Sequence, residues 1–265
     1  MRLKGTSIIF IIVLVLFLNT VVLADAVGVF NVDNIEKGLL KINAENLNGN
    51  FKLMVQKDDS KYYYSINKTE EIVPLQLGSG EYELFFLENV SGNKYKILEK
   101  KQINVDIEDD MSIYLQSAQP VEWSQDMEAI KLAKELTKDI NNDKDKIKVI
   151  YEYIIENIKY DSEKIQNIND NYIPNIDNTL QEKKGICYDY SSLYGAMLRS
   201  LNIPTKLVKG NKNDIDVYHA WNEVYIKEEG KWVTIDTIYD ATMKENGTSY
   251  DMIKDNKEYE KIREY

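Results

Sequence analysis

The sequence GICYDYSSLYGAMLRSLNIPTK, residues 185–206, contains the clearest structural pattern of this chain. Apolar and aromatic side chains recur in it at the spacing of one buried helical face: Tyr190, Leu193, Tyr194, Met197 and Leu201. Gly185 marks the start of this helix, and Pro204 prevents its continuation. The pattern therefore predicts a helix from about Tyr188 to Leu201, followed at once by a strand.

The segments on either side predict helices before this point and strands after it. The expected segments are helices around Met127–Leu136 and Ile147–Ile158, then strands over Thr205–Val208, Tyr218–Ile226 and Lys231–Ile235. Residues 161–177 are polar and rich in Asn and Asp, so we expect a long surface loop there. The tail after Asn246 is charged and rich in tyrosine, and we expect an edge helix packed on the core. Residues 120–265 are thus predicted to form one α+β domain.

Residues 25–119 have a different pattern, which predicts a small β-sandwich-like domain. Short alternating or apolar runs are separated by turn-like clusters: the runs are Phe51–Val55, Tyr62–Ile66, Tyr82–Leu87 and Gln102–Val105. The region contains no histidine, no cysteine and no clustered metal-ligand spacing. We interpret it as a spacer or binding module.

The first 24 residues resemble an export signal. Arg2 and Lys4 form a positive start, Ile8–Leu18 is an unbroken apolar run, and Val22–Ala24 supplies small residues for cleavage. The alternative is an uncleaved anchor, although Asn19 and Thr20 interrupt the run, which is short for a membrane span. The signal predicts a secreted protein, extracellular or associated with the cell wall, with no stable membrane insertion after cleavage.

The composition of the chain disfavours several kinds of binding partner and of catalytic chemistry. The formal net charge of −11 disfavours binding to a phosphate backbone or to an anionic lipid surface. One cysteine cannot form an internal disulfide, so in an exported protein it is either buried and inert or kept for its reactivity. One histidine and one cysteine make a poor set of zinc ligands, and we expect neither a metal nor a cofactor.

Cys187, His219 and Asp236 form the one constellation that indicates catalysis. Cys187 falls at a helix start, where unpaired N–H groups and the helix dipole favour a thiolate. His219 is the sole histidine and lies on an expected strand. If Lys227–Gly230 form the turn of a hairpin, the numbers of residues that face each other across it sum to about 457. His219 then faces residue 238, and Asp236 is its diagonal neighbour on the same face of the sheet, within side-chain reach. A carboxylate there could orient the imidazole that accepts the thiol proton.

The motifs around these residues resemble those of the transglutaminase-like superfamily. Gly185–Leu193 is similar to the cysteine motif, Leu198–Lys206 to the run that follows it, His219–Val224 to the histidine motif and Trp232–Thr237 to the aspartate motif. Ile158–Asp161 is similar to the end of the preceding helix in that family. The resemblance covers about residues 125–240 and does not extend to the N-terminal region.

The resemblance implies a papain-like α+β core and a Cys-His-Asp triad. Cys187 would attack an amide carbonyl to form a thioester, with His219 as base and acid and Asp236 orienting it. The backbone N–H of Cys187 is a candidate oxyanion donor; Gln181 and Tyr172 are candidates for the second. Trp221 and Tyr188 either line the cleft or pack in the core.

The sequence is consistent with two classes of function. The first is a secreted cysteine hydrolase or acyltransferase acting on protein or cell-wall peptide, as a protease or amidase or as a cross-linking enzyme. The second is a non-catalytic cell-surface binding or scaffold module that retains the fold. Degenerate members usually lose part of the triad, whereas this chain keeps Cys187, His219 and Asp236.

Overall fold

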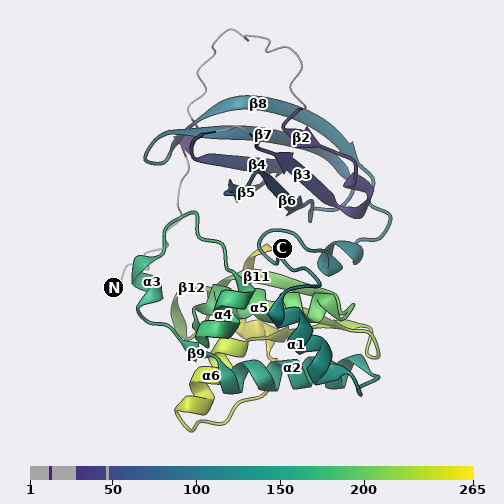
Figure 1. Ribbon diagram of the computed structural model, residues 1–265, viewed down its shortest axis with the longest axis vertical. Helices are drawn as coiled ribbons and strands as arrows, with labels where there is room; N and C mark the ends of the chain where they lie inside the picture. The colour runs from purple at the N-terminus through teal and green to yellow at the C-terminus, as the bar shows by residue number, and fades with distance from the viewer. Residues whose placement is uncertain (1–11, 14–27, 46–47) are drawn as a thin grey trace.

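The computed structural model describes residues 12–13, 28–45 and 48–265 (Figure 1). Most of the expected export segment, residues 1–24, lies outside the described residues. Within it the structure describes only the short strand β1 (Ile12–Val13), which pairs in parallel with β8 (Lys94–Val105). No helix in the described part of the chain has the length and apolar character needed to span a membrane.

The N-terminal region folds into two sheets that pack against each other, as its strand pattern predicts (Figure 1). One sheet has the order β1-β8-β7-β4-β5, and the other has the order β2-β3-β6. Their strands are β2 Phe30–Asn31, β3 Leu39–Asn43, β4 Phe51–Lys57, β5 Ser60–Ile66, β6 Glu70–Pro74 and β7 Gly80–Ser91. Apart from β1, neighbouring strands run antiparallel. The core between the sheets includes Phe51 and Phe86, whose rings stack with centroids 5.3 Å apart.

A central helix organises the C-terminal region. The helices are α1 Glu128–Thr137, α2 Asp143–Asn157, α3 Lys164–Asn167, α4 Ile176–Glu182, α5 Cys187–Ser200 and α6 Thr237–Glu245. Helix α5 contacts α1, α2, α4 and α6 on its sides and β11 and β12 of the sheet beneath it. This position explains why α5 is buried all round from Asp189 to Arg199, its serines included. At Gly195 a Cβ would lie 3.3 Å from Asn222 and Val121, so close packing favours glycine there.

The sheet under α5 has the strand order β14-β13-β12-β11-β15. Its strands are β11 Thr205–Lys212, β12 Ile215–Ile226, β13 Lys231–Ile235, β14 Ile253–Lys254 and β15 Tyr259–Glu264. A separate parallel pair, β9 Lys159–Tyr160 and β10 Lys184–Gly185, leads into α5. The ladder between β12 and β13 runs from Asn222 opposite Ile235 to Ile226 opposite Lys231. The hairpin register predicted from the turn, in which the numbers of facing residues sum to 457, is therefore confirmed.

The structure corrects the sequence predictions at two places. The tail after Asn246 does not end in an edge helix, because Tyr259–Glu264 form strand β15, which covers the edge of β11. The expected loop at 161–177 contains the short helix α3 and the start of α4. In addition, α6 was not predicted from the pattern: it begins where the Asp236 carboxylate accepts the N–H of Tyr239.

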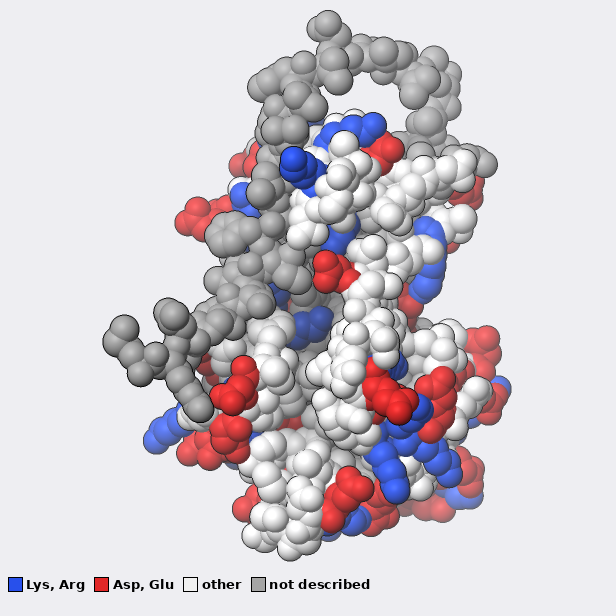
Figure 2. Space-filling model, turned by 90° about the vertical axis from the view of Figure 1, so that its left-hand side faces the viewer, with Lys and Arg blue, Asp and Glu red and all other residues white. Residues whose placement is uncertain are grey.

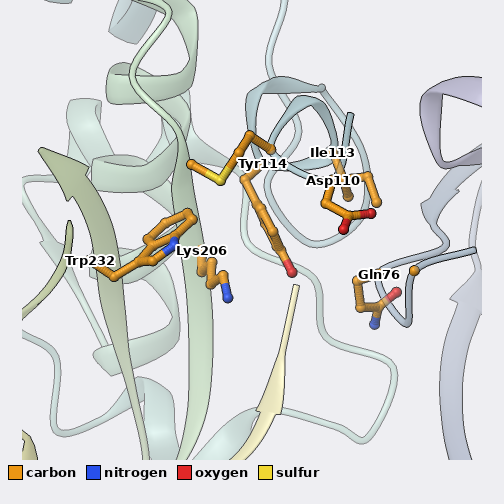
Figure 3. Close-up of a pocket in the computed structure, with 8 residues that line it drawn as sticks. Gln76, Asp110, Ile113, Tyr114, Lys206 and Trp232 are labelled. Atoms are coloured by element: carbon orange, nitrogen blue, oxygen red, sulfur yellow. The ribbon is translucent and has the colours of Figure 1, made fainter. Parts of the chain in front are cut away.

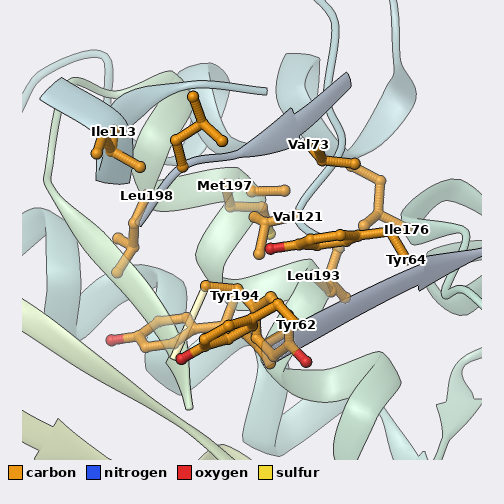
Figure 4. Close-up of a cluster of buried hydrophobic side chains, with 14 of the residues drawn as sticks. Tyr62, Tyr64, Val73, Ile113, Val121, Ile176, Leu193, Tyr194, Met197 and Leu198 are labelled. Atoms are coloured by element: carbon orange, nitrogen blue, oxygen red, sulfur yellow. The ribbon is translucent and has the colours of Figure 1, made fainter. Parts of the chain in front are cut away.

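A continuous hydrophobic core joins the two regions (Figure 4). Tyr62 and Tyr64 of β5 lie among side chains of α5, and both rings pack edge-on against Tyr265, at 5.5 and 6.1 Å. Polar contacts close the same junction, where the side chain of Gln119 accepts the N–H of Ser65 and donates to its carbonyl. The N-terminal sandwich is thus held firmly against the domain that contains Cys187.

The junction also contains a cavity of about 310 Å³, between β11, β13 and the turn Ser112–Leu115 (Figure 3). The Lys206 ammonium lies in it between the rings of Tyr114 and Trp232, at 4.7 and 4.6 Å. It also forms an ion pair with Glu264 at 3.0 Å. Its charge is compensated within the chain, and none of Cys187, His219 and Asp236 lines this cavity.

Candidate active site

Cys187 is the first residue of α5 and its side chain is half-buried. The N–H groups of this first turn have no partner within the helix, and the positive end of the helix dipole lies at the same point. Both features favour negative charge on the sulfur or on an oxygen bound beside it. The sequence prediction that Cys187 lies at a helix start is confirmed.

The carboxylate of Asp189 fixes the approach to this helix start. It is fully buried and accepts the N–H of Ile186 at 2.8 Å. Gly185 is required for this contact, because a Cβ at that position would lie 2.7 Å from the Asp189 Cβ. The backbone on either side of Cys187 is therefore held by one buried acid.

The same carboxylate anchors the segment between β9 and α4. Lys164 of α3 forms an ion pair with Asp189 at 2.9 Å, and the hydroxyl of Tyr172 donates to it. Burial raises the pKa of Tyr172, and Asp189 raises it further. The Tyr172 hydroxyl is thus engaged in the structure and is not placed as a free oxyanion donor. Gln181, the other candidate, has an exposed side chain on α4.

His219 lies on β12, opposite Gly210 of β11, and is buried. Its Nε2 is 2.7 Å from Oδ2 of Asp236. Because Asp236 occupies Nε2, the Nδ1 nitrogen is left for the thiol, and Cys187 is close enough to the imidazole to raise its pKa. The contact between His219 and Asp236 that the hairpin geometry predicts is present in the structure.

Asp236 is fully buried between β13 and α6, where several donors hold its carboxylate. Its Oδ1 accepts the N–H of Tyr239 at 3.2 Å, and its Oδ2 accepts the hydroxyl of Tyr259 at 3.1 Å in addition to the His219 contact. A buried carboxylate with these partners is kept in one orientation. Tyr259 is a component of the site that sequence reasoning missed, because β15 was not predicted.

The imidazole of His219 is stabilised in its protonated form. Burial by itself lowers its pKa, but the charge and hydrogen bond of Asp236 and the adjacent Cys187 outweigh burial and raise the pKa to about 10. An imidazolium beside a thiol favours the thiolate by direct charge attraction. The pair thus has the arrangement of a nucleophile beside its base.

Aromatic side chains shield the imidazole. The ring of Trp221 lies parallel to that of His219 at 6.3 Å and contacts Tyr259 at 5.0 Å. Trp221 is fully buried, so it packs behind the histidine and does not line a cleft. Tyr188 is half-buried, and the ammonium of Lys209 lies 3.3 Å from its ring centroid. Lys209 is a second residue that sequence reasoning missed, because the predicted strand Thr205–Val208 ended one residue before it, whereas β11 continues to Lys212.

Within the described residues no group of His, Cys, Asp and Glu side chains is arranged to hold a metal ion.

The comparison with known families agrees with this geometry. Residues 130–237 match the sequence profile of the transglutaminase-like superfamily, a span that runs from α1 past Asp236. The C-terminal domain is therefore a mixed α+β domain of the transglutaminase-like superfamily, as its motifs indicate.

A curated relative extends the similarity beyond this span. The chain is 30% identical over 204 residues to the protein YebA of Bacillus subtilis (strain 168). The matched part is 69% of this chain and 27% of YebA, so the chain spans about a quarter of the length of that relative.

Solved structures with a similar arrangement include two bacterial proteins. One is a candidate cysteine protease from Cytophaga hutchinsonii, 18% identical, covering 86% of this chain and 75% of that chain with a TM-score of 0.46. The other is the periplasmic domain of TgpA from Pseudomonas aeruginosa, 14% identical, covering 81% of this chain and 93% of that chain with a TM-score of 0.42.

Proposed function

We propose that this protein is a secreted cysteine enzyme that cleaves an amide and transfers the acyl group to water or to an amine. The observation that carries the proposal is the buried hydrogen bond of 2.7 Å between His219 and Asp236, next to a cysteine at a helix start. Nucleophile, base and orienting acid stand in the order that acyl transfer requires.

The first half of the proposed reaction forms a thioester. The Cys187 thiolate attacks the amide carbonyl carbon, and the carbonyl oxygen takes the negative charge. The backbone N–H of Cys187 is the proposed donor to that oxygen, because amides in the first turn of a helix have no partner within the helix. The His219 imidazolium then gives its proton to the leaving amine as the carbon–nitrogen bond breaks.

The second half regenerates the thiol group. Neutral His219 takes a proton from water or from an acceptor amine, whose oxygen or nitrogen attacks the thioester carbon. The carbon–sulfur bond breaks, and the pair returns to thiolate and imidazolium. Asp236 keeps the imidazole in one orientation through both halves. Water as acceptor makes the enzyme a protease or amidase, and a lysine amine makes it a cross-linking transferase.

The substrate class that we propose is protein or cell-wall peptide outside the cytoplasm. The motif pattern of the first residues supports export. The acidic charge of the chain disfavours nucleic acid as a substrate.

The first test is the rate of iodoacetamide labelling of Cys187, followed by intact mass from about pH 4 to about pH 9. We expect fast labelling that persists well below the titration of a free thiol, because the imidazolium of His219 stabilises the thiolate. Labelling that rises only near the titration of a free thiol, about pH 8.5, or that never occurs, would contradict the enzyme and favour a non-catalytic scaffold.

A further inference from the structure

Two basic side chains stand opposite each other on the strands beside the candidate nucleophile. Lys209 of β11 pairs with Arg263 of β15 on one side and with Ala220, the residue after His219, on the other. The Lys209 ammonium lies over the ring of Tyr188, the residue after Cys187. Lys209 is therefore adjacent in space to the neighbours of both His219 and Cys187.

Neither cation is paired with a carboxylate within the described part of the chain. The Arg263 guanidinium lies 5.2 Å from the Tyr62 ring and donates to the carbonyl of Lys61, while Lys209 contacts the rings of Tyr188 and Tyr265. Among the described residues, no carboxylate forms an ion pair with Lys209 or Arg263.

Other lysines on the same two strands are paired. Lys206 of β11 forms an ion pair with Glu264 at 3.0 Å, and Lys261 of β15 pairs with Glu223 and Glu264 at 2.9 and 2.7 Å. The chain as a whole has 44 acidic against 33 basic side chains, so an acidic partner would be easy to supply. The lack of a carboxylate partner is thus specific to the two cations beside Cys187.

Without a bound anion, the two neighbouring cations lower the stability of the folded state. Like charges directly opposite each other on neighbouring strands destabilise a sheet, and a half-buried cation such as Lys209 is stabilised by a partner of opposite charge. Burial lowers the pKa of Lys209 to about 7, a change that the Cys187 thiolate opposes and Arg263 reinforces. An anion bound between the two cations would relieve both penalties.

We propose that Lys209 and Arg263 form a subsite for a carboxylate that the substrate carries close to its scissile amide. This inference rests on the proposed function and specifies the substrate class as peptides with a carboxylate near the scissile amide, either at a chain terminus or on an acidic side chain. The rings of Tyr62, Tyr188 and Tyr265 form the apolar walls around the two cations. Figure 2 shows a hollow between the two regions of the molecule with a basic side chain inside it.

The test compares two alkylating reagents of nearly equal size, anionic iodoacetate and neutral iodoacetamide, on the full chain at about pH 6, where Lys209 keeps its proton. The readout is the ratio of the two labelling rates at Cys187. We expect this ratio to exceed that of N-acetylcysteine amide in the same buffer by about tenfold, and to fall as salt is added. A ratio equal to that of the free thiol at low salt would overturn the proposal.

Variants assign the effect to the two cations. Lys209→Met and Arg263→Met should each lower the ratio by about threefold or more, through the iodoacetate rate. Lys231→Met is the matched control, because Lys231 is an exposed lysine of the same sheet, paired with Glu229 at 2.8 Å, and its loss should leave the ratio unchanged. If Lys209→Met does not fold, Arg263→Met and the salt dependence of the unaltered chain still decide the question.

A protection experiment separates two sources of the carboxylate. N-acetylalanine offers a terminal carboxylate, N-acetylglutamate α-amide offers an acidic side chain, and N-acetylalanine amide is the neutral control. Slower iodoacetamide labelling with the first indicates a chain terminus, and slower labelling with the second indicates an acidic residue. Equal labelling with all three would overturn the assignment to a substrate carboxylate.

The two proposals fail in different ways. An inert Cys187 gives slow labelling by both reagents and contradicts the proposed enzyme. If Cys187 is reactive but its ratio of labelling rates equals that of a free thiol, the proposed enzyme is supported and the carboxylate subsite is contradicted.

Discussion

The hydroxyl of Tyr259 donates a hydrogen bond of 3.1 Å to Oδ2 of Asp236, the same oxygen that lies 2.7 Å from His219. Tyr259 begins β15, 23 residues beyond Asp236, so the last strand of the described fold contributes directly to the candidate triad. Burial raises the pKa of the Tyr259 hydroxyl, and the charge of Asp236 raises it further, so the hydroxyl stays a donor.

We expect Tyr259→Phe to lower kcat by about tenfold with little change in KM, because a hydrogen bond to a charged group contributes roughly 1.5–3 kcal/mol. Asp236 would keep its contact with the N–H of Tyr239 but lose the donor that orients Oδ2. The pH profile of Cys187 labelling should also move, which a merely structural loss would not cause. Tyr239→Phe is the control, because its hydroxyl bonds to Asp214 at the surface.

Cys187→Ala should abolish activity and leave the thermal midpoint within a few degrees of the unaltered chain. The side chain is half-buried at a helix start, so its loss leaves no internal cavity of note. Differential scanning calorimetry and an amide-cleavage assay measure the two effects. A large fall in the midpoint would instead identify Cys187 as a structural residue.

The stability of the fold should depend on pH through His219. Its pKa is raised to about 10 in the folded state, above the value of about 6.5 in the unfolded chain. A raised pKa contributes stability that is fully present below about pH 6.5 and is lost as the pH rises through about 10.

We therefore expect the free energy of unfolding to fall by roughly 2–5 kcal/mol between about pH 6 and about pH 10, and to fall less in His219→Asn. Urea unfolding at several pH values measures this difference. Parallel pH curves for both proteins would show that the imidazolium contributes nothing to stability.

Asp189→Ala should lower stability by about 3 kcal/mol, because it leaves the ammonium of Lys164 unpaired and the N–H of Ile186 without its acceptor. The start of α5 would loosen, so iodoacetamide labelling of Cys187 should slow as well. Asp143→Ala is the matched control, since Asp143 lies at a surface helix start with Lys146 at 3.7 Å. Unchanged labelling in Asp189→Ala would show that the nucleophile does not depend on this anchor.

Local patterns were sufficient for much of the fold. The apolar spacing of α1, α2 and α5 predicted those helices, because a helix buries residues that lie three or four apart. The same holds for β12 and β13, whose turn at Lys227–Gly230 predicted the register from Asn222 to Ile226. Since that register places Asp236 diagonally from His219, the pairing of these two residues followed from the sequence as well.

Other parts of the site depend on segments that meet only in the folded chain. Helix α6 and strand β15 have weak local patterns, and β15 was expected to be helical; it is a strand because it closes the edge of β11. Asp189 at the start of α5 contacts Lys164 and Tyr172 of the polar segment before α4. Helix α4 and strand β10 separate that segment from α5 in the chain, so the contact forms only in the folded protein.

The sequence by itself determined the α+β core and the hairpin register, and it singled out Cys187, His219 and Asp236 as candidates, because helix periods and turns are short-range properties. The tertiary structure alone brought Tyr259 to Asp236 and placed Arg263 opposite Lys209 beside the nucleophile. Strand β15 makes both contacts by returning to the sheet from the end of the chain. A pairing between such distant segments depends on packing and on the free edge of β11, which no local pattern encodes.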